Sequence, residues 1–333
     1  MKMKRHVCYP VLGVLLALVG ASCDQPDTAA PTTDWKIGVL LYGDSRIPQT
    51  DGFLDGLKEL GFEPGRNLAV TVLNAKNDKA KLAGYAQTLI GDGANLLVAS
   101  GGLEAEALRK QIGDRDIPLI VLYINAIVER GFVRERRNPG WNVTGVDNLN
   151  AELSGKRVEL LHALVPEARR ILVLYHPKIK PSVIGVEHAR TLGRKLGLTI
   201  VDREVRSRED IERTMASLER GQVDAMLTVP TAPIDNALKE FILPHVERLG
   251  IALMTHSRPM AEAGALASYG APFYDLGKQA SRLVGKILNG TRADRIPFEV
   301  PMNYVYTVNR STMNRLNIEL SDLARSQINE FVD

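Results

Sequence analysis

The sequence predicts an α/β protein with two similar lobes, each a parallel sheet flanked by helices, joined by a hinge. Apolar runs of strand length alternate with amphipathic segments of helix length along most of the 333 residues. This alternation is typical of parallel sheets whose strands are linked by crossover helices. The pattern restarts after Asn138-Pro139-Gly140, a turn signal that leads into a short strand over residues 140–147. We therefore expect the chain to pass from one lobe to the other at this stretch.

The first 22 residues have the form of a bacterial lipoprotein signal peptide. A basic start, an apolar run over residues 11–19 and the small residues Gly20-Ala21-Ser22 precede Cys23. The apolar run is shorter than the roughly 20 residues that a membrane-spanning helix needs. We expect residues 1–22 to be removed, Cys23 to be lipidated by acyl chains such as palmitate, and residues 23–34 to form a flexible tether. The alternative is an ordinary secreted protein in which Cys23 has no role.

Composition argues against several classes of protein. Hydrophobic residues make up 45% and charged residues 24%, which is ordinary for a globular protein. The formal charge is +3, but the basic residues of the leader supply that excess, and blocks of one charge sign are short. A nucleic-acid partner is therefore not expected. Cys8 would leave with the signal peptide, so Cys23 alone would remain and no intramolecular disulfide or cysteine-based metal site is expected.

The first lobe is expected over residues 35–143. Its strands are largely apolar, as in a sheet covered on both faces, and lie near residues 35–41, 68–74, 95–100 and 118–123. Its helices are expected near residues 49–60 and 79–90 and after Ser100. The first helix places its apolar residues on one face and ends at Gly61.

The second lobe is expected over residues 144–270. Its strands are predicted near residues 170–175, 198–203, 223–229, 250–255 and 265–270, and its helices near residues 151–164, 182–196 and 208–219 and after Pro233. Residues 271–295, with a helix near 273–288, are expected to return to the first lobe, and residues 296–333, with a strand near 298–308, to the second. Several crossings would make a hinge, which suits a protein that closes on a ligand.

Motifs for common cofactors are missing. The chain has neither the GxGxxG nor the GxxxxGK[ST] nucleotide fingerprint, and it has no GxSxG or HExxH sequence. Its six His residues show no metal-ligand spacing. We therefore expect no cofactor, no metal and no catalytic residue.

Candidate ligand-binding residues follow the expected strands, because ligands of open α/β sheets lie at the carboxyl ends of the strands. Ser100-Gly101-Gly102 could offer free N–H groups to an anion at a helix start, although a plain helix cap is the alternative reading. Thr231 carries the same two readings, and a tyrosine at a strand end offers a flat apolar face with a hydroxyl. The full set of candidates is Tyr42, Ser45, Ser100, Gly101, Gly102, Tyr123, Asn125, Asp147, Tyr175, His176, Thr231, Ser257 and Tyr269.

Several segments together resemble a known family. They are Lys36-Ile-Gly-Val-Leu40, Gly52-Phe-Leu-Asp-Gly-Leu-Lys-Glu-Leu-Gly61-Phe62, Asn142-Val-Thr-Gly-Val-Asp147, Ile171-Leu-Val-Leu-Tyr175, Gly264-Ala-Leu-Ala-Ser-Tyr269-Gly270 and Tyr274-Asp-Leu-Gly-Lys-Gln279. In this order they resemble the substrate-binding lipoproteins of ABC transporters, in particular the tryptophan- and tyrosine-type components. The resemblance implies a type I periplasmic-binding-protein fold and a cleft in which the loop after the first strand, Ser100, Asp147, Tyr175 and Thr231 face the ligand.

Two departures from the family pattern bear on the ligand. Relatives often have Thr-Asp-Pro where this chain has Asn125-Ala126-Ile127, and Pro-Thr-Asp-Asn where it has Pro230-Thr231-Ala232-Pro233. Two ligand-facing carboxylates implied by the resemblance are thus absent. An amino group would lose partners, which counts against an ordinary amino acid as the ligand.

The resulting expectation is a non-catalytic solute-binding component of an ABC uptake transporter, outside the cytoplasm and lipid-anchored to a membrane. Its partners would be a small ligand, with aromatic and amino-acid-like solutes as candidates, and the permease and ATPase of the transporter. We expect a monomer. The alternatives are a ligand-sensing subunit for a membrane kinase or chemoreceptor and, less favoured, a lipoprotein enzyme.

Overall fold

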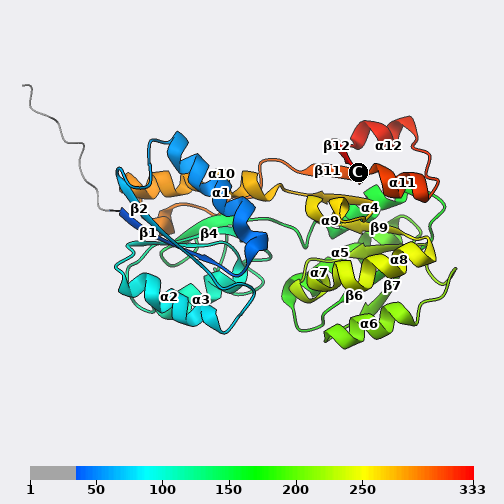
Figure 1. The fold of residues 1–333 in the computed structure, drawn as a ribbon, viewed down its shortest axis with the longest axis horizontal. Helices are drawn as coiled ribbons and strands as arrows, with labels where there is room; N and C mark the ends of the chain where they lie inside the picture. The colour runs from blue at the N-terminus through cyan, green and yellow to red at the C-terminus, as the bar shows by residue number, and fades with distance from the viewer. Residues whose placement is uncertain (1–34) are drawn as a thin grey trace, which may run out of the picture. The chain divides into compact units, whose positions relative to one another are not determined.

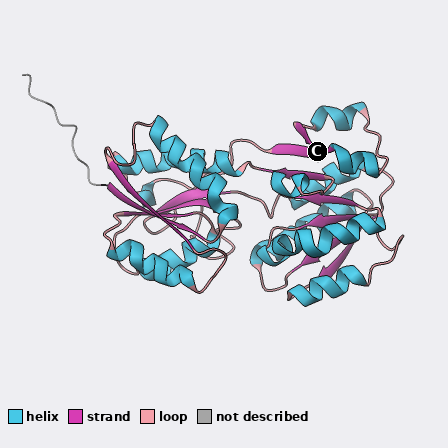
Figure 2. Ribbon diagram, viewed as in Figure 1, coloured by secondary structure: helices cyan, strands magenta, loops and turns pink. Residues whose placement is uncertain are grey.

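The computed structural model describes residues 35–333. The expected signal peptide (1–22), the tether (23–34) and Cys23 lie outside the described residues. Within residues 35–333, two separate sheets have helices on both faces (Figures 1 and 2). This confirms the predicted architecture of two α/β lobes.

The first lobe has a five-stranded parallel sheet in the order β2-β1-β3-β4-β5. Its strands are β1 (Trp35–Leu41), β2 (Leu68–Asn74), β3 (Leu96–Ala99), β4 (Leu119–Ile124) and β5 (Val143–Asp147). Its helices are η1 (Asp44–Arg46), α1 (Ile47–Glu59), α2 (Lys81–Gly91), α3 (Gly102–Ile112), α10 (Phe273–Leu288) and η3 (Ala293–Arg295). Every residue of β3, β4 and β5 is buried, which explains why β3 and β4 are apolar without alternation.

The second lobe has a seven-stranded sheet in the order β12-β11-β10-β9-β8-β6-β7. Its strands are β6 (Arg170–Tyr175), β7 (Thr199–Glu204), β8 (Ala225–Thr228), β9 (Ala252–Thr255), β10 (Ala267–Gly270), β11 (Val305–Asn309) and β12 (Glu330–Val332). Its helices are α4 (Ser154–Leu164), α5 (Lys180–Lys195), α6 (Arg208–Ala216), α7 (Ala232–Ala237), η2 (Leu238–Ile242), α8 (Leu243–Leu249), α9 (Arg258–Glu262), α11 (Arg310–Arg315) and α12 (Asp322–Gln327).

The two sheets repeat one topology. Counted from the first strand of each lobe, both run second, first, third, fourth, fifth. Gly61 and Gly197 stand at matching places, two residues after the helix that precedes the second strand of each lobe, and have φ angles of +85° and +70°. A residue with a Cβ rarely adopts this conformation, so glycine is needed for the turn out of the preceding helix. The second sheet is mixed rather than purely parallel, because β11 pairs antiparallel with β10.

Two lobe boundaries differ from the sequence-based expectation. β5 pairs in parallel with β4, so the first sheet extends to Asp147 instead of ending at residue 143. The strand expected over residues 298–308 is divided: Glu299 bridges Val146 in the first lobe, whereas β11 begins only at Val305. Pro301 stands between them and has no N–H to donate, so one continuous ladder cannot form. The last return to the second lobe therefore follows residue 299, not residue 295.

Helix α10 completes the first lobe from far along the chain. It lies along α1 (Figure 1), and the two helices share a core with β1 and β4. The approach is close, because a Cβ added to Gly277 would lie 1.8 Å from the carbonyl oxygen of Gln49, and one added to Gly52 would lie 2.0 Å from that of Tyr274. The chain thus crosses between the lobes after β5, after β10 and again between Glu299 and β11.

No helix within residues 35–333 combines the length and the apolar character needed to cross a membrane.

Candidate functional site

The carboxyl ends of the parallel strands gather polar side chains from both lobes. Arg46 follows β1 in the first lobe, whereas Asp235 on α7 and His256 after β9 belong to the second. The charge of Arg46 influences the pKa of both Asp235 and His256. The carboxyl ends of the strands in the two lobes therefore contribute to one electrostatic environment.

Arg157 on α4 is the central cation. Its side chain is fully buried, and its Nε donates to the carbonyl oxygen of Tyr269 over 2.7 Å. Its Nη1 donates to the carbonyl oxygen of Asn150 over 2.6 Å, and its Nη2 donates to the Oδ1 of the same residue. These acceptors are neutral, and no ion pair joins Arg157 to a carboxylate among the described residues. Burial lowers the pKa of Arg157 to about 9, although nearby Tyr123, Tyr269 and Asp235 act in the opposite direction. The site thus holds a buried positive charge without a bonded counter-ion.

Asp235 and His256 form a second group. The Oδ2 of Asp235 lies 3.6 Å from the Nε2 of His256, which is too far for a hydrogen bond. Burial raises the pKa of Asp235 to about 8, against the effects of Arg46 and Arg157. Burial, with repulsion from the same two arginines, lowers the pKa of His256 to about 3, so this imidazole is neutral at pH 7. Asp235 Oδ1 and His256 Nδ1 are both buried without a hydrogen-bond partner.

Arg46 is held by Glu104 from α3. The Nε of Arg46 lies 3.5 Å from Oε1 of Glu104, which also accepts the N–H of Tyr42 over 2.8 Å. Glu104 is fully buried, so this carboxylate is a structural anchor for the loop after β1. The guanidinium of Arg46 stands 5.3 Å from the centre of the Tyr123 ring, within cation–π range.

Asp147, at the end of β5, is the third acidic group. Its Oδ2 accepts the Nε of Arg136 over 2.6 Å, and Arg136 also lies 3.5 Å from Glu152. Burial raises the pKa of Asp147 to about 6, although Arg136 opposes this shift. Asp147 Oδ1 and Glu152 Oε2 are buried without a partner, so this pair retains acceptor capacity beyond Arg136.

Aromatic rings border these polar groups. Tyr123 packs edge-on against Phe273 with ring centres 5.3 Å apart, and its hydroxyl accepts Asn150 Nδ2 over 3.3 Å. Tyr269, whose carbonyl binds Arg157, stacks on Tyr304 with ring centres 5.8 Å apart. A planar apolar group could pack in such surroundings.

Some of the predicted site residues have structural hydrogen bonds. The hydroxyl of Ser100 donates to the carbonyl oxygen of Leu40 over 2.9 Å. Tyr175 donates to Glu204 over 3.1 Å, within its own sheet. His176 is held by its loop, since its N–H donates to Ser182 and its Nδ1 accepts the N–H of Lys178. Gly101 and Gly102 begin α3, where an added Cβ would lie 3.1 Å from the Arg46 guanidinium or 3.2 Å from that of Arg130, respectively.

Other predicted residues leave polar atoms unpartnered. The buried Thr231 Oγ1 and the Asn125 Oδ1 have no hydrogen-bond partner. Ser257 precedes α9 without a side-chain cap bond and lines a pocket of about 330 Å³, which it shares with Pro48 and Phe273. Ser45 is exposed in η1, and Tyr42 packs its ring partly against the core.

Sequence reasoning missed the charged centre of the site. Arg157 stands in Lys156-Arg157-Val158-Glu159, which reads as the solvated face of a helix. Six other charged or polar residues are also absent from the set predicted to bind the ligand: Arg46, Glu104, Asn150, Glu152, Asp235 and His256. The juxtaposition depends on the packing of the lobes, which a single sequence does not reveal.

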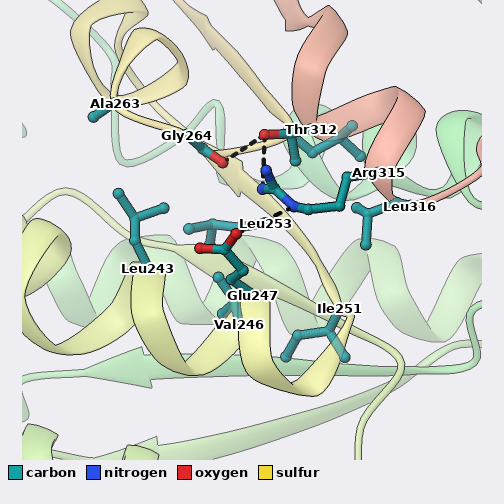
Figure 3. A pocket seen from close by; sticks show the side chains of 11 residues that line it. Leu243, Val246, Glu247, Ile251, Leu253, Ala263, Gly264, Thr312, Arg315 and Leu316 are labelled. Atoms are coloured by element: carbon teal, nitrogen blue, oxygen red, sulfur yellow. Dashed lines mark hydrogen bonds and ion pairs between the residues drawn. The ribbon is translucent and has the colours of Figure 1, made fainter.

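Two further features of residues 35–333 concern metal binding and a second cavity. Within residues 35–333, no cluster of three or more His, Cys, Asp or Glu side chains could hold a metal ion. A separate cavity of about 160 Å³ lies between α8 and α11 (Figure 3). It adjoins Ile251 and Leu266, at the amino ends of β9 and β10, and an ion pair of 3.6 Å between Arg315 and Glu247 borders it. It is therefore at the opposite sheet edge from the polar groups described above.

Comparisons with known proteins show the family to which the chain belongs. The family model described as ABC transporter substrate binding protein matches residues 36–329. A tyrosine-binding protein of Clostridioides difficile is 26% identical over 334 residues, covering 96% of this chain and 94% of the relative.

Solved structures show the same fold. A domain from Streptococcus pneumoniae in complex with L-Trp has a TM-score of 0.80 at 24% identity, with 90% of this chain and 100% of that chain covered. A ligand-free, open substrate-binding protein with adhesive properties from Clostridium difficile has a TM-score of 0.73 at 23% identity, with coverages of 90% and 99%. With the family model spanning nearly all described residues, the chain belongs to the ABC transporter substrate-binding protein family.

Proposed function

We propose that this substrate-binding protein carries a free α-amino acid with an aromatic side chain to the permease and ATPase of its transporter. The observation that carries this proposal is the coexistence of a buried, uncompensated cation and unpartnered carboxylate oxygens. Arg157 supplies the cation, and Asp147 and Asp235 supply the oxygens. An α-amino acid bears its carboxylate and its ammonium on one carbon, so a site for it needs both signs of charge close together.

The carboxylates that relatives have at residues 125–127 and 232 are missing from this chain, but the structure places other carboxylates at the site. Asp235 lies one helical turn beyond Ala232 on α7, and Asp147 and Glu152 lie beside Arg136. Three carboxylates therefore belong to the site without those two positions.

The aromatic preference follows from the rings of Tyr123, Phe273, Tyr269 and Tyr304 around the charged groups. The names of the relatives point the same way, since one is a tyrosine-binding protein and another was solved with L-Trp. Binding needs no bond-breaking step, and we propose that the protein is not an enzyme. We also propose that it acts as a monomer, held at the outer side of a membrane by lipid on Cys23.

The ligand is tested by isothermal titration with L-tyrosine, L-tryptophan, L-phenylalanine, L-leucine and D-ribose. We expect the aromatic amino acids to bind, with L-leucine at least ten-fold weaker and no heat from ribose. Arg157→Met should weaken the binding of the aromatic amino acids by about 30-fold or more, because a charged hydrogen-bonding partner is lost. Arg66→Met is the control, since the Arg66 side chain is 72% exposed and, within residues 35–333, forms an ion pair with Glu63 alone, at 3.4 Å. Binding of ribose in preference to every amino acid would refute the proposal.

The anchor is tested separately by expressing the full chain with Cys23→Ser in a bacterium supplied with radiolabelled palmitate. We expect label on the wild-type protein and none on the variant. Equal labelling of both proteins, or of neither, would contradict lipidation at Cys23.

A further inference from the structure

Asp235 differs from the other acidic groups of the site in having no cation bonded to it. Asp147 has Arg136 at 2.6 Å and is fully buried, whereas 28% of the Asp235 side chain is exposed and its carboxylate accepts no side-chain hydrogen bond in the structure. Its contact with His256 is a 3.6 Å approach to a neutral ring. Among these carboxylates, Asp235 is thus partly exposed and has no cation bonded to it, and its Oδ1 has no hydrogen-bond partner among the described residues.

Thr231, the first residue of the turn that carries Asp235, offers a further acceptor. Its carbonyl oxygen accepts the Asp235 N–H over 3.0 Å. The Thr231 hydroxyl oxygen is buried and has no hydrogen-bond partner among the described residues. A primary ammonium has three N–H donors and no acceptor, so a site for it needs acceptors such as Asp235 Oδ1 and Thr231 Oγ1.

The arginines near Asp235 carry the charge that would attract the carboxylate of an amino acid. Arg46 from η1 and Arg157 from α4 act on the Asp235 carboxyl without forming an ion pair with it. His256 is the remaining titratable neighbour and is uncharged. Arg46, whose side chain is 19% exposed, is the arginine that a ligand carboxylate could contact, and its charge already acts on Asp235.

We propose that Asp235 is the residue that binds the ligand's ammonium group and that it releases its proton when the ligand binds. The proposal rests on the proposed function, since it assumes an α-amino acid ligand. Without ligand the carboxyl is largely protonated at pH 7, because burial raises its pKa to about 8. A bound ammonium favours the ionised carboxylate and lowers that pKa. The proton passes to solvent, and the ligand enters and leaves as the same zwitterion.

The sign of the pH dependence follows. Below the pKa of the free carboxyl, each ligand bound displaces up to one proton, so affinity rises with pH by up to about ten-fold per unit. Above it, the carboxylate is already ionised and affinity levels off. We therefore expect tighter binding at pH 8 than at pH 6.

The test is titration calorimetry of the full-length protein in detergent with L-tyrosine, in phosphate and in Tris at pH 6, 7 and 8. The two buffers differ in ionisation enthalpy, so the difference in heat counts the protons released. We expect more than half a proton released at pH 7 and an affinity at least ten-fold higher at pH 8 than at pH 6. Asp235→Asn should abolish the proton release, flatten the pH dependence and weaken binding by about 10- to 100-fold at pH 8.

Two controls isolate the ammonium contact. Asp51→Asn removes an exposed carboxylate from α1 and should leave binding unchanged. The deamino analogue 3-(4-hydroxyphenyl)propanoate lacks the ammonium, so its affinities for wild type and for Asp235→Asn should agree within about three-fold. Binding of L-tyrosine without proton release, or with equal affinity in Asp235→Asn, would overturn the assignment of Asp235 and leave the proposed function standing. Failure of every aromatic amino acid to bind the wild-type protein would refute both.

Discussion

Gly277→Ala should lower the free energy of unfolding by about 3 kcal/mol or more. The added Cβ would lie 1.8 Å from the carbonyl oxygen of Gln49 and 2.8 Å from the backbone nitrogen of Phe53. Both obstacles are backbone atoms of α1, so no side chain can rotate away and the two helices must separate. Separation would loosen the buried contacts of Phe53, Leu57 and Leu276. Overpacking ordinarily costs about 1–3 kcal/mol, and a backbone clash belongs at the upper end of that range.

Thermal melts followed by circular dichroism measure this effect. For a chain of this size each kcal/mol corresponds to about 2–4 °C, so the midpoint should fall by about 6 °C or more. Gly84→Ala is the matched control, because Gly84 also lies inside a helix but an added Cβ there meets nothing within 4 Å. That variant should gain about 0.5–1 kcal/mol from helix propensity alone. If Gly277→Ala melted within 2 °C of the wild type, the close approach of α1 and α10 would be wrong.

Three more predictions concern the charged groups. Arg157→Met should destabilise the protein by about 2–4 kcal/mol in urea unfolding, because it leaves the buried carbonyl oxygens of Asn150 and Tyr269 without a donor; no change in midpoint would contradict these bonds. Asp235→Asn should become more stable relative to the wild type as pH rises from 4 to 8, since a raised folded-state pKa means that the wild type loses stability as the carboxyl ionises; a constant difference across this range would refute the shifted pKa. Arg109→Ala should cost about 1–2 kcal/mol and change the fluorescence of Trp141, whose ring centre lies 4.9 Å from the guanidinium; an unchanged emission spectrum would argue against the stacking.

Much of the fold follows from local patterns. The strands over residues 35–41, 68–74 and 170–175 and the helix over 273–288 have the predicted bounds, because apolar runs and amphipathic periodicity identify buried strands and helices. Glu299 shows where this approach fails. Its pairing with Val146 depends on a partner 153 residues away, which a local pattern does not reveal.

The site was harder to predict than the fold. Strand ends indicate where a ligand could lie, and Tyr123, Asp147 and Thr231 do lie near the charged groups. Sequence alone could not separate these from Ser100 and Tyr175, whose hydroxyls bond within their own lobes. Nor could it identify Arg157, because a buried arginine and a solvated one look alike until the neighbouring segments are folded around it.

The first lobe contains segments from late in the sequence, and this connectivity constrains the order in which the lobe can fold. Its sheet is complete at Asp147, but α10 covers it only from residue 273, and Glu299 extends its edge later still. A chain that emerges amino terminus first therefore exposes the apolar side of α1 and β1 until nearly nine-tenths of its length is available. The contacts of α1 and β1 with α10 therefore form late in the synthesis of the chain, after most of the second lobe is available.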